Sequence, residues 1–151
     1  ARTVTRITRT AAAVLWASRM RVAVADSGVG NVHSVLRAVT RAADDAGLSA
    51  RTELTADLAT LRRADALVVP GHGAFGAIAD AMQGGLGEVL GERIRAGAPY
   101  LGICLGLQVL FEGSDEAPGA RGLGILRGHV ARLAPGRAPS PWAALRCRRG
   151  S

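Results

Sequence analysis

The fold of this chain is decided by one stretch, Pro99-Tyr100-Leu101-Gly102-Ile103-Cys104-Leu105-Gly106-Leu107-Gln108. An apolar run ends at Cys104, with a glycine two residues before it and another two residues after it. A strand that turns sharply into a helix crowds its flanks, where only glycine fits. The pattern therefore predicts a strand–turn–helix elbow that exposes the Cys104 sulfur as a nucleophile. The alternative is an ordinary buried cysteine on a core strand.

The first third of the chain predicts alternating strands and helices. An apolar strand at 22–26 runs into the glycine loop 27–31, and a helix follows from Val32 until Gly47 ends it. The loop lacks the third glycine of a dinucleotide-binding fingerprint, because His33 stands there, so no nucleotide cofactor is expected. Two weaker elements come next: an edge strand at 48–53, and a short helix from Leu54 to Arg63 with Thr55 as its N-cap.

A second glycine loop lies upstream of the elbow. The all-apolar strand at 66–69 ends in the loop 70–76, whose three glycines indicate unusual backbone angles or close approach to a ligand. A helical region interrupted near Gly84 leads to the elbow, and residues 122–130 read as a turn and a strand.

This order predicts an α/β fold, an open and mostly parallel flavodoxin-like sheet with helices on both faces. Both the 70–76 loop and the elbow leave the carboxyl ends of strands, which is where open α/β sheets bind ligands. A cysteine beside a set of backbone N–H groups on one rim suits acyl transfer.

The charge of the chain lies at its two ends. The net charge is +7, yet residues 21–126 carry nine arginines and twelve acidic residues. With few aromatic residues as well, this distribution argues against nucleic-acid binding. No apolar run is long enough to cross a bilayer. Two cysteines, Cys104 and Cys147, do not make a disulfide framework, and a catalytic thiol suits the reducing cytoplasm.

Three regions are expected from composition. Residues 1–19 read as a non-native N-terminal extension, residues 20–133 as the folded domain, and residues 134–151 as an irregular basic tail. Near residue 134 the sequence becomes rich in Pro, Arg and Ala and loses its periodicity, as it would at a truncation or a shift of reading frame. A domain that lacks further strands is expected to expose apolar surface.

Four segments together resemble the class I (triad-type) glutamine amidotransferases, and within that family the glutaminase subunit of imidazole glycerol phosphate synthase. The elbow resembles Gly-Ile-Cys-Leu-Gly-Met-Gln, and the loop 70–76 resembles Pro-Gly-Val-Gly-Ala-Phe with His72 in place of an apolar residue. The segment 26–31 resembles Asp-Tyr-Gly-x-Gly-Asn with Ser27 in place of the aromatic residue. The segment 122–126 resembles the part of the family that follows, so the resemblance covers residues 20–133.

The resemblance implies hydrolysis of glutamine to glutamate and ammonia, with the ammonia passed to a cyclase subunit that makes imidazole glycerol phosphate in histidine biosynthesis. It implies a heterodimer with that cyclase subunit and requires neither cofactor nor metal. The roles it implies are Cys104 as nucleophile, Leu105 and Gly73 (through the His72–Gly73 peptide) as oxyanion donors, Gly71, Gly106 and Gln108 as the substrate site, and Gly30 and Asn31 as residues facing the partner.

The family's triad also needs a His-x-Glu near the C-terminus. The chain has three histidines, His33, His72 and His129, and none is followed two residues later by glutamate. We therefore expect negligible glutaminase activity from this polypeptide, because no imidazole would activate the thiol or protonate the leaving ammonia. Two other interpretations stay open: a non-catalytic subunit that only binds the cyclase, and another small cysteine hydrolase that uses His129.

Overall fold

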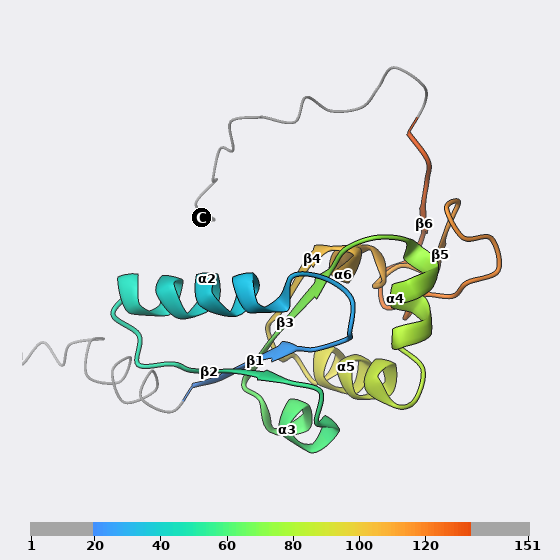
Figure 1. The fold of residues 1–151 in the computed structure, drawn as a ribbon. Coiled ribbons are helices and arrows are strands. Elements are labelled where there is room, and N and C mark those ends of the chain that lie inside the picture. Colours follow the sequence, from blue (N-terminus) through green and yellow to red (C-terminus); the bar gives the residue numbers. More distant parts are fainter. Residues whose placement is uncertain (1–19, 134–151) are drawn as a thin grey trace, which may run out of the picture.

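The fold centres on a four-stranded parallel sheet with helices on both of its faces (Figure 1). The computed structural model describes residues 20–133, so the predictions made for 1–19 and 134–151 lie outside the described residues. The strands run parallel in the order β2-β1-β3-β4, which confirms the predicted sheet. Their bounds are β1 Arg21–Ala25, β2 Arg51–Thr55, β3 Ala66–Gly71 and β4 Tyr100–Cys104.

The helices follow the predicted alternation, and a short parallel pair of strands, β5 (Gly113–Ser114) and β6 (His129–Val130), ends the described chain. Within the segment 122–130, only His129 and Val130 form a strand, so the prediction of a turn and a strand there is confirmed in part. Within residues 20–133, no helix combines the length and the apolar character needed to cross a bilayer. The helix bounds are α2 Val32–Asp45, α3 Leu58–Arg63, α4 Phe75–Ala81, α5 Leu86–Arg95 and α6 Leu105–Gln108.

The start of α3 corrects the prediction made for residues 54–63. Thr55 is the last residue of β2 and not a helix cap, because its pairing with Ala25 of β1 holds it in the sheet. Asp57 is the N-cap instead: its carboxylate accepts from the Thr60 N–H at 2.8 Å and from the Thr60 hydroxyl at 2.6 Å. These bonds lower the pKa of Asp57 and fix the first helical residue at Leu58, four residues later than the predicted start at Leu54. The edge strand is likewise shifted, from 48–53 to the bounds of β2.

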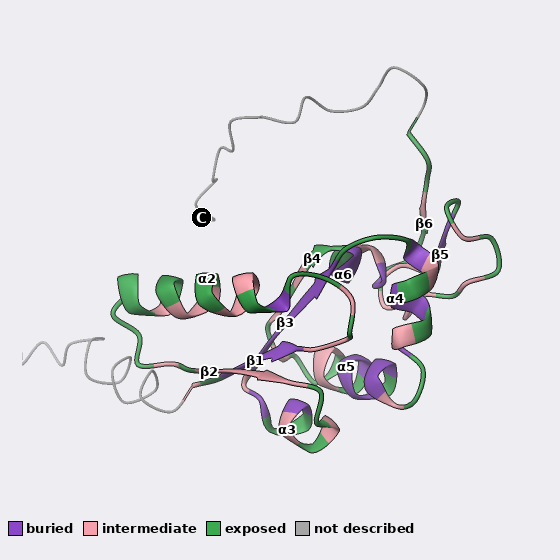
Figure 2. Ribbon diagram, viewed as in Figure 1, coloured by how far each residue is buried: buried purple, intermediate pink, exposed green. Residues whose placement is uncertain are grey.

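The sheet separates two apolar clusters. The larger cluster lies on the face covered by α3, α4, α5 and α6, and the smaller one lies under α2 (Figures 1 and 2). The strand residues of the larger cluster are Ala23, Ala25, Leu67 and Val69, packed with Leu61, Ile78, Val89, Leu90, Leu105 and Val109. Those of the smaller cluster are Val22, Val24, Ala66 and Val68, packed with Val35, Leu36 and Val39.

Among residues 20–133, no helix covers β4 on the face that carries α2. Leu101 pairs with Val68 and Ile103 with Pro70, so both side chains lie on the face that α2 covers farther along the sheet. Leu101 is 53% exposed and Ile103 is 37% exposed. Within the described chain, β4 also has no strand on its outer edge. The exposed apolar surface expected from the sequence is thus confirmed, and it lies on the strand that carries Cys104.

We predict that Leu101→Lys reduces self-association of the polypeptide. The strand Tyr100–Cys104 holds no charge, and an uncharged free edge invites pairing with another chain, which a lysine opposes. Light scattering at matched concentrations measures the effect. Leu48→Lys is the matched control, because Leu48 is 40% exposed but lies outside every strand. An equal effect of both substitutions would show that the edge of β4 is not the source.

Candidate active site

Cys104 occupies a strained elbow between β4 and α6. Its backbone has φ 55° and ψ −113°, and among residues 20–133 it is the one non-glycine residue with positive φ. Such a conformation costs about 1–3 kcal/mol and persists only where the surroundings enforce it. The Cys104 side chain is exposed and forms no disulfide. The predicted nucleophile elbow is therefore present, and the alternative of a buried core cysteine is wrong.

The two flanking glycines are required by close backbone contacts. A Cβ on Gly102 would lie 2.5 Å from the Gly106 carbonyl oxygen, and a Cβ on Gly106 would overlap the carbonyl oxygen of Val69. The helix that follows is a single turn, and it packs directly onto β3 through Gly106 and Leu105. Glycine spacing in the sequence thus reports a real steric limit on how closely the turn approaches β3.

The Tyr100 side chain ties the elbow back to its own strand. Its hydroxyl donates to the Gly106 carbonyl oxygen at 2.7 Å. Burial raises the pKa of Tyr100 well above its ordinary value, so the phenol stays protonated and keeps this donor. The bond satisfies a carbonyl in the first turn after Cys104. It also joins the start of β4 to α6, and so restrains the segment that contains Cys104.

The loop after β3 lies directly beside Cys104. Gly71 is opposite Cys104 in the strand register, and a Cβ on Gly71 would lie 2.7 Å from the Leu105 Cβ and 2.9 Å from the Gly106 nitrogen. Gly73 has φ 104° and is exposed, with nothing within 4 Å of an added Cβ. The structure therefore brings Gly71, Gly73, Leu105 and Gly106 to the same rim as the thiol. Their roles in binding an oxyanion or substrate stay predictions.

The loop after β1 completes this rim. A Cβ on Gly30 would lie 3.4 Å from the His72 nitrogen, so the first glycine loop packs against the second. Asn31 accepts from the Ser34 N–H at 3.2 Å and caps α2. Both Gly30 and Asn31 are exposed, as a surface open to a partner requires. The carboxyl ends of β1, β3 and β4 thus converge, which is the edge where open α/β sheets bind ligands (Figure 1).

A hollow of about 370 Å³ lies beside Gln108, the last residue of α6, and sequence reasoning missed most of it. Gln108, four residues after Cys104, lines it together with Ser114, Glu116 and Arg132. The Glu116 carboxylate accepts from the Phe75 N–H at 3.3 Å, which ties this hollow to the end of the loop after β3. Its polar residues come from segments without periodicity, so only the Gln108 position in the elbow motif pointed to it.

The histidines do not complete a triad with Cys104. His33 is exposed in the first turn of α2, as a plain surface residue, and His72 is exposed in the loop after β3. The Nε2 atom of His129 lies 3.0 Å from Asp115 Oδ1. Among residues 20–133, no ion pair or hydrogen bond joins an imidazole to the Cys104 sulfur. The structure gives no support to the alternative in which His129 activates the thiol.

Several known proteins are similar to this chain in sequence or in fold. The chain is 43% identical over 129 residues to the imidazole glycerol phosphate synthase subunit HisH of Thermus thermophilus, covering 84% of this chain and 62% of that protein. It is 45% identical over 115 residues to HisH of Deinococcus radiodurans, covering 76% and 51%. A crystal structure of a glutamine amidotransferase matches with a TM-score of 0.58 at 26% identity, over 77% of this chain and 58% of that one. No protein-family profile matches the chain.

The chain resembles the imidazole glycerol phosphate synthase HisH subunits in sequence and a glutamine amidotransferase in fold. The resemblance read from the elbow and from the two glycine loops is thereby confirmed. The chain spans less than two thirds of each HisH protein named above. What the HisH proteins do as whole subunits is therefore a matter of proposal for this chain.

We predict that Gly106→Ala destabilises the folded domain. The added methyl would overlap the Val69 carbonyl oxygen, so the free energy of unfolding should fall by about 1–3 kcal/mol, the usual cost of overpacking. Urea unfolding followed by circular dichroism measures it. Gly76→Ala is the matched control, because Gly76 lies in α4 and the nearest atom to its added Cβ is 3.8 Å away. An unchanged urea midpoint for Gly106→Ala would contradict the close contact described above.

Proposed function

We propose that this chain carries the nucleophile and the glutamine-binding surface of a glutaminase, which hydrolyses glutamine to glutamate and ammonia. The observation that carries the proposal is the exposed Cys104 thiol on its strained elbow, directly opposite Gly71. The similarity to the HisH subunits and to a glutamine amidotransferase structure supports glutamine as the substrate. The reaction needs neither a cofactor nor a metal.

The proposed chemistry is acyl transfer to sulfur. The Cys104 thiolate attacks the side-chain amide carbon of glutamine, and the carbonyl oxygen takes up the negative charge. When the amide nitrogen is protonated, ammonia leaves and a glutamyl thioester remains on Cys104. Water then attacks the thioester, which releases glutamate and restores the thiol.

The charge on the oxygen requires donors fixed in advance. The Leu105 N–H follows the nucleophile directly, and the peptide between His72 and Gly73 lies two residues beyond the position opposite Cys104. We assign these two N–H groups as the oxyanion donors. Loss of one such donor typically costs about 10²–10³ in rate. The freedom of Gly73 at φ 104° suits a peptide that must turn its N–H toward the substrate.

The hollow beside Gln108 has the polarity that free glutamine requires. Glutamine carries an α-ammonium group and an α-carboxylate, and the lining offers the Glu116 carboxylate and the Arg132 guanidinium. Gln108 lies one helical turn from Cys104, within reach of a substrate that spans from the thiol to the hollow. We propose that Gly71 and Gly106, whose backbones pack together beside Cys104, complete the substrate site.

Glu116→Gln is expected to weaken glutamine binding about tenfold, because it removes the negative charge but keeps an oxygen that can accept from the Phe75 N–H. Calorimetric titration with glutamine measures this, in a Cys104→Ser background that prevents turnover. The control is Glu112→Gln, whose carboxylate accepts from the Gly128 N–H at 3.2 Å and does not line the hollow. Equal affinities of the three proteins would remove the hollow from the substrate site.

The polypeptide of 151 residues is expected to turn over glutamine at a negligible rate. It holds no His-x-Glu, and an ordinary thiol without an imidazole is mostly protonated at neutral pH. Glutamate release measured with excess glutamine tests this, and Cys104→Ser provides the background. Glutamate release that Cys104→Ser abolishes would refute the expectation and would show that another group serves as base.

We further propose that the chain acts with a cyclase subunit in the cytoplasm, as a heterodimer that passes ammonia to the synthesis of imidazole glycerol phosphate in histidine biosynthesis. The support is the name of its HisH relatives, which are subunits of imidazole glycerol phosphate synthase. The exposed Gly30 and Asn31 beside the rim are the residues assigned to the partner. Co-purification with the cyclase without glutamine turnover would favour the non-catalytic, cyclase-binding role.

A further inference from the structure

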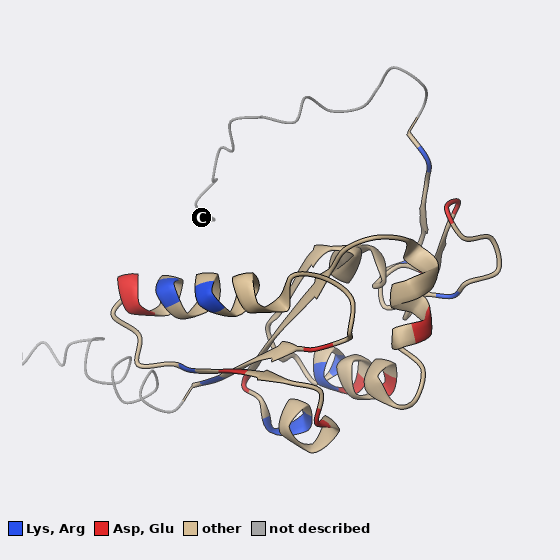
Figure 3. Ribbon diagram, viewed as in Figure 1, with Lys and Arg blue, Asp and Glu red and all other residues tan. Residues whose placement is uncertain are grey.

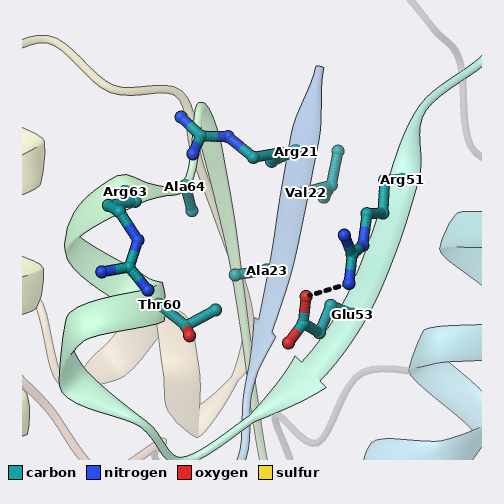
Figure 4. Close-up of a pocket in the computed structure, with 8 residues that line it drawn as sticks. All are labelled: Arg21, Val22, Ala23, Arg51, Glu53, Thr60, Arg63 and Ala64. Carbon is teal, nitrogen blue, oxygen red and sulfur yellow. Dashed lines mark ion pairs between the residues drawn. The ribbon is translucent and has the colours of Figure 1, made fainter. Parts of the chain in front are cut away.

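A second hollow lies at the amino ends of the strands, whereas Cys104 lies at their carboxyl ends. Arg21 and Arg51 are the first residues of β1 and β2, whereas Cys104 is the last residue of β4, and all these strands are parallel. The hollow has a volume of about 250 Å³ and is enclosed by β1, β2 and α3 (Figure 4). The residues that decide its chemistry are Arg21, Ala23, Arg51, Glu53, Thr60 and Arg63.

The strand register concentrates positive charge there. Arg21 is directly opposite Arg51, and Ala23 is directly opposite Glu53, so all four side chains lie on the α3 face of the sheet. Like charges directly opposite each other on neighbouring strands are unfavourable unless a counter-charge lies near. A third guanidinium, that of Arg63, comes from α3 on the other side of the hollow (Figure 4), and Figure 3 shows how the Lys and Arg positions are distributed over the fold. The small side chain of Ala23 leaves the space between them open.

Two of the three guanidinium groups, those of Arg21 and Arg51, have a carboxylate partner. Asp65 accepts from the Arg21 backbone N–H at 2.7 Å and from its guanidinium at 3.3 Å, and these bonds lower the pKa of Asp65. Glu53 meets Arg51 at 3.5 Å, with side chains that are 42% and 79% exposed, which is a weak pair. Among residues 20–133, Arg63 forms no ion pair within 4 Å.

The remaining groups near the hollow are committed elsewhere. Asp57 lies close enough to Arg63 for the guanidinium to contribute to lowering its pKa, but its carboxylate is held mainly by Thr60 as the cap of α3. The Thr60 hydroxyl donates to Asp57 and is not free to donate into the hollow. The lining therefore presents three guanidinium groups and one carboxylate.

We propose that this hollow binds a small phosphate-type anion, either free phosphate or the phosphate group of a small ester. Guanidinium groups bind phosphate oxygens through paired N–H donors, and three groups approaching from three elements suit a tetrahedral anion better than a planar carboxylate. The volume is below the roughly 300–1,000 Å³ of sites for drug-sized ligands, so the anion is small. Binding would neutralise the Arg21–Arg51 pair and link α3 to the sheet.

The test is calorimetric titration of the full polypeptide with inorganic phosphate, with glycerol phosphate and with acetate, at constant ionic strength. Both phosphates should bind at least about tenfold more tightly than acetate, and Arg51→Gln and Arg63→Gln should each weaken phosphate binding about tenfold. Stronger binding of glycerol phosphate than of inorganic phosphate would identify an ester as the ligand, and the reverse would identify the free anion.

The matched control is Arg41→Gln, because Arg41 is an exposed arginine that pairs with Asp45 at 3.0 Å on α2, across the sheet from the hollow. It should bind phosphate as the unaltered chain does. Phosphate that binds no better than acetate, or an equal loss in Arg41→Gln, would overturn the proposal. The result can be separated from glutamine binding at the carboxyl ends of the strands. Arg63→Gln should leave glutamine binding unchanged, because Cys104 does not line this hollow.

Discussion

The structure depends on the contact between the Cys104 elbow and the carboxyl end of β3. Gly106 lies against the Val69 carbonyl, and Leu105 lies against Gly71, at distances that exclude any side chain between the two backbones. The buried side chains of Leu105 and Val109 on the same turn anchor it in the larger cluster. Packing of this kind is what holds Cys104 at φ 55°, because an isolated turn would relax to a less costly conformation.

The two faces of β4, the strand that ends at Cys104, are covered unequally. On one face, α6 and the larger cluster cover β4, and on the other face Leu101 and Ile103 meet solvent. The smaller cluster has four buried residues, all from β1 and β3, so α2 contributes little to holding β4 in place. Reactivity and stability are therefore linked here, since the strand that orients the thiol is also the strand with the least complete burial.

Local steric rules made the elbow and the sheet predictable from the sequence. The glycines around Cys104, the all-apolar strand at 66–69, and the start of the first helix at Val32 with its stop at Gly47 are signals that a few neighbouring residues carry, and the structure confirms them. Thr55 failed because pairing with β1, a long-range interaction, outweighed its local tendency to cap a helix. Glu116 was missed because residues 112–132 have no period, and only the folded chain brings its carboxylate to the Phe75 N–H.

Because the strands are parallel, the carboxyl ends of the strands form one edge of the sheet and the amino ends form the other, and the two edges carry different chemical groups. At the carboxyl edge, glycine loops expose backbone N–H groups beside the Cys104 thiol, which suits a charge that develops during reaction. At the amino edge, each strand can begin with a charged side chain, and the register then sets Arg21 beside Arg51. Fixed guanidinium charge at that edge would be tolerated in a glutaminase, because the length of the strands separates it from the thiol and solvent screens what remains. The same topology that collects backbone donors at one edge thus leaves the other edge free to acquire a binding site without disturbing the first.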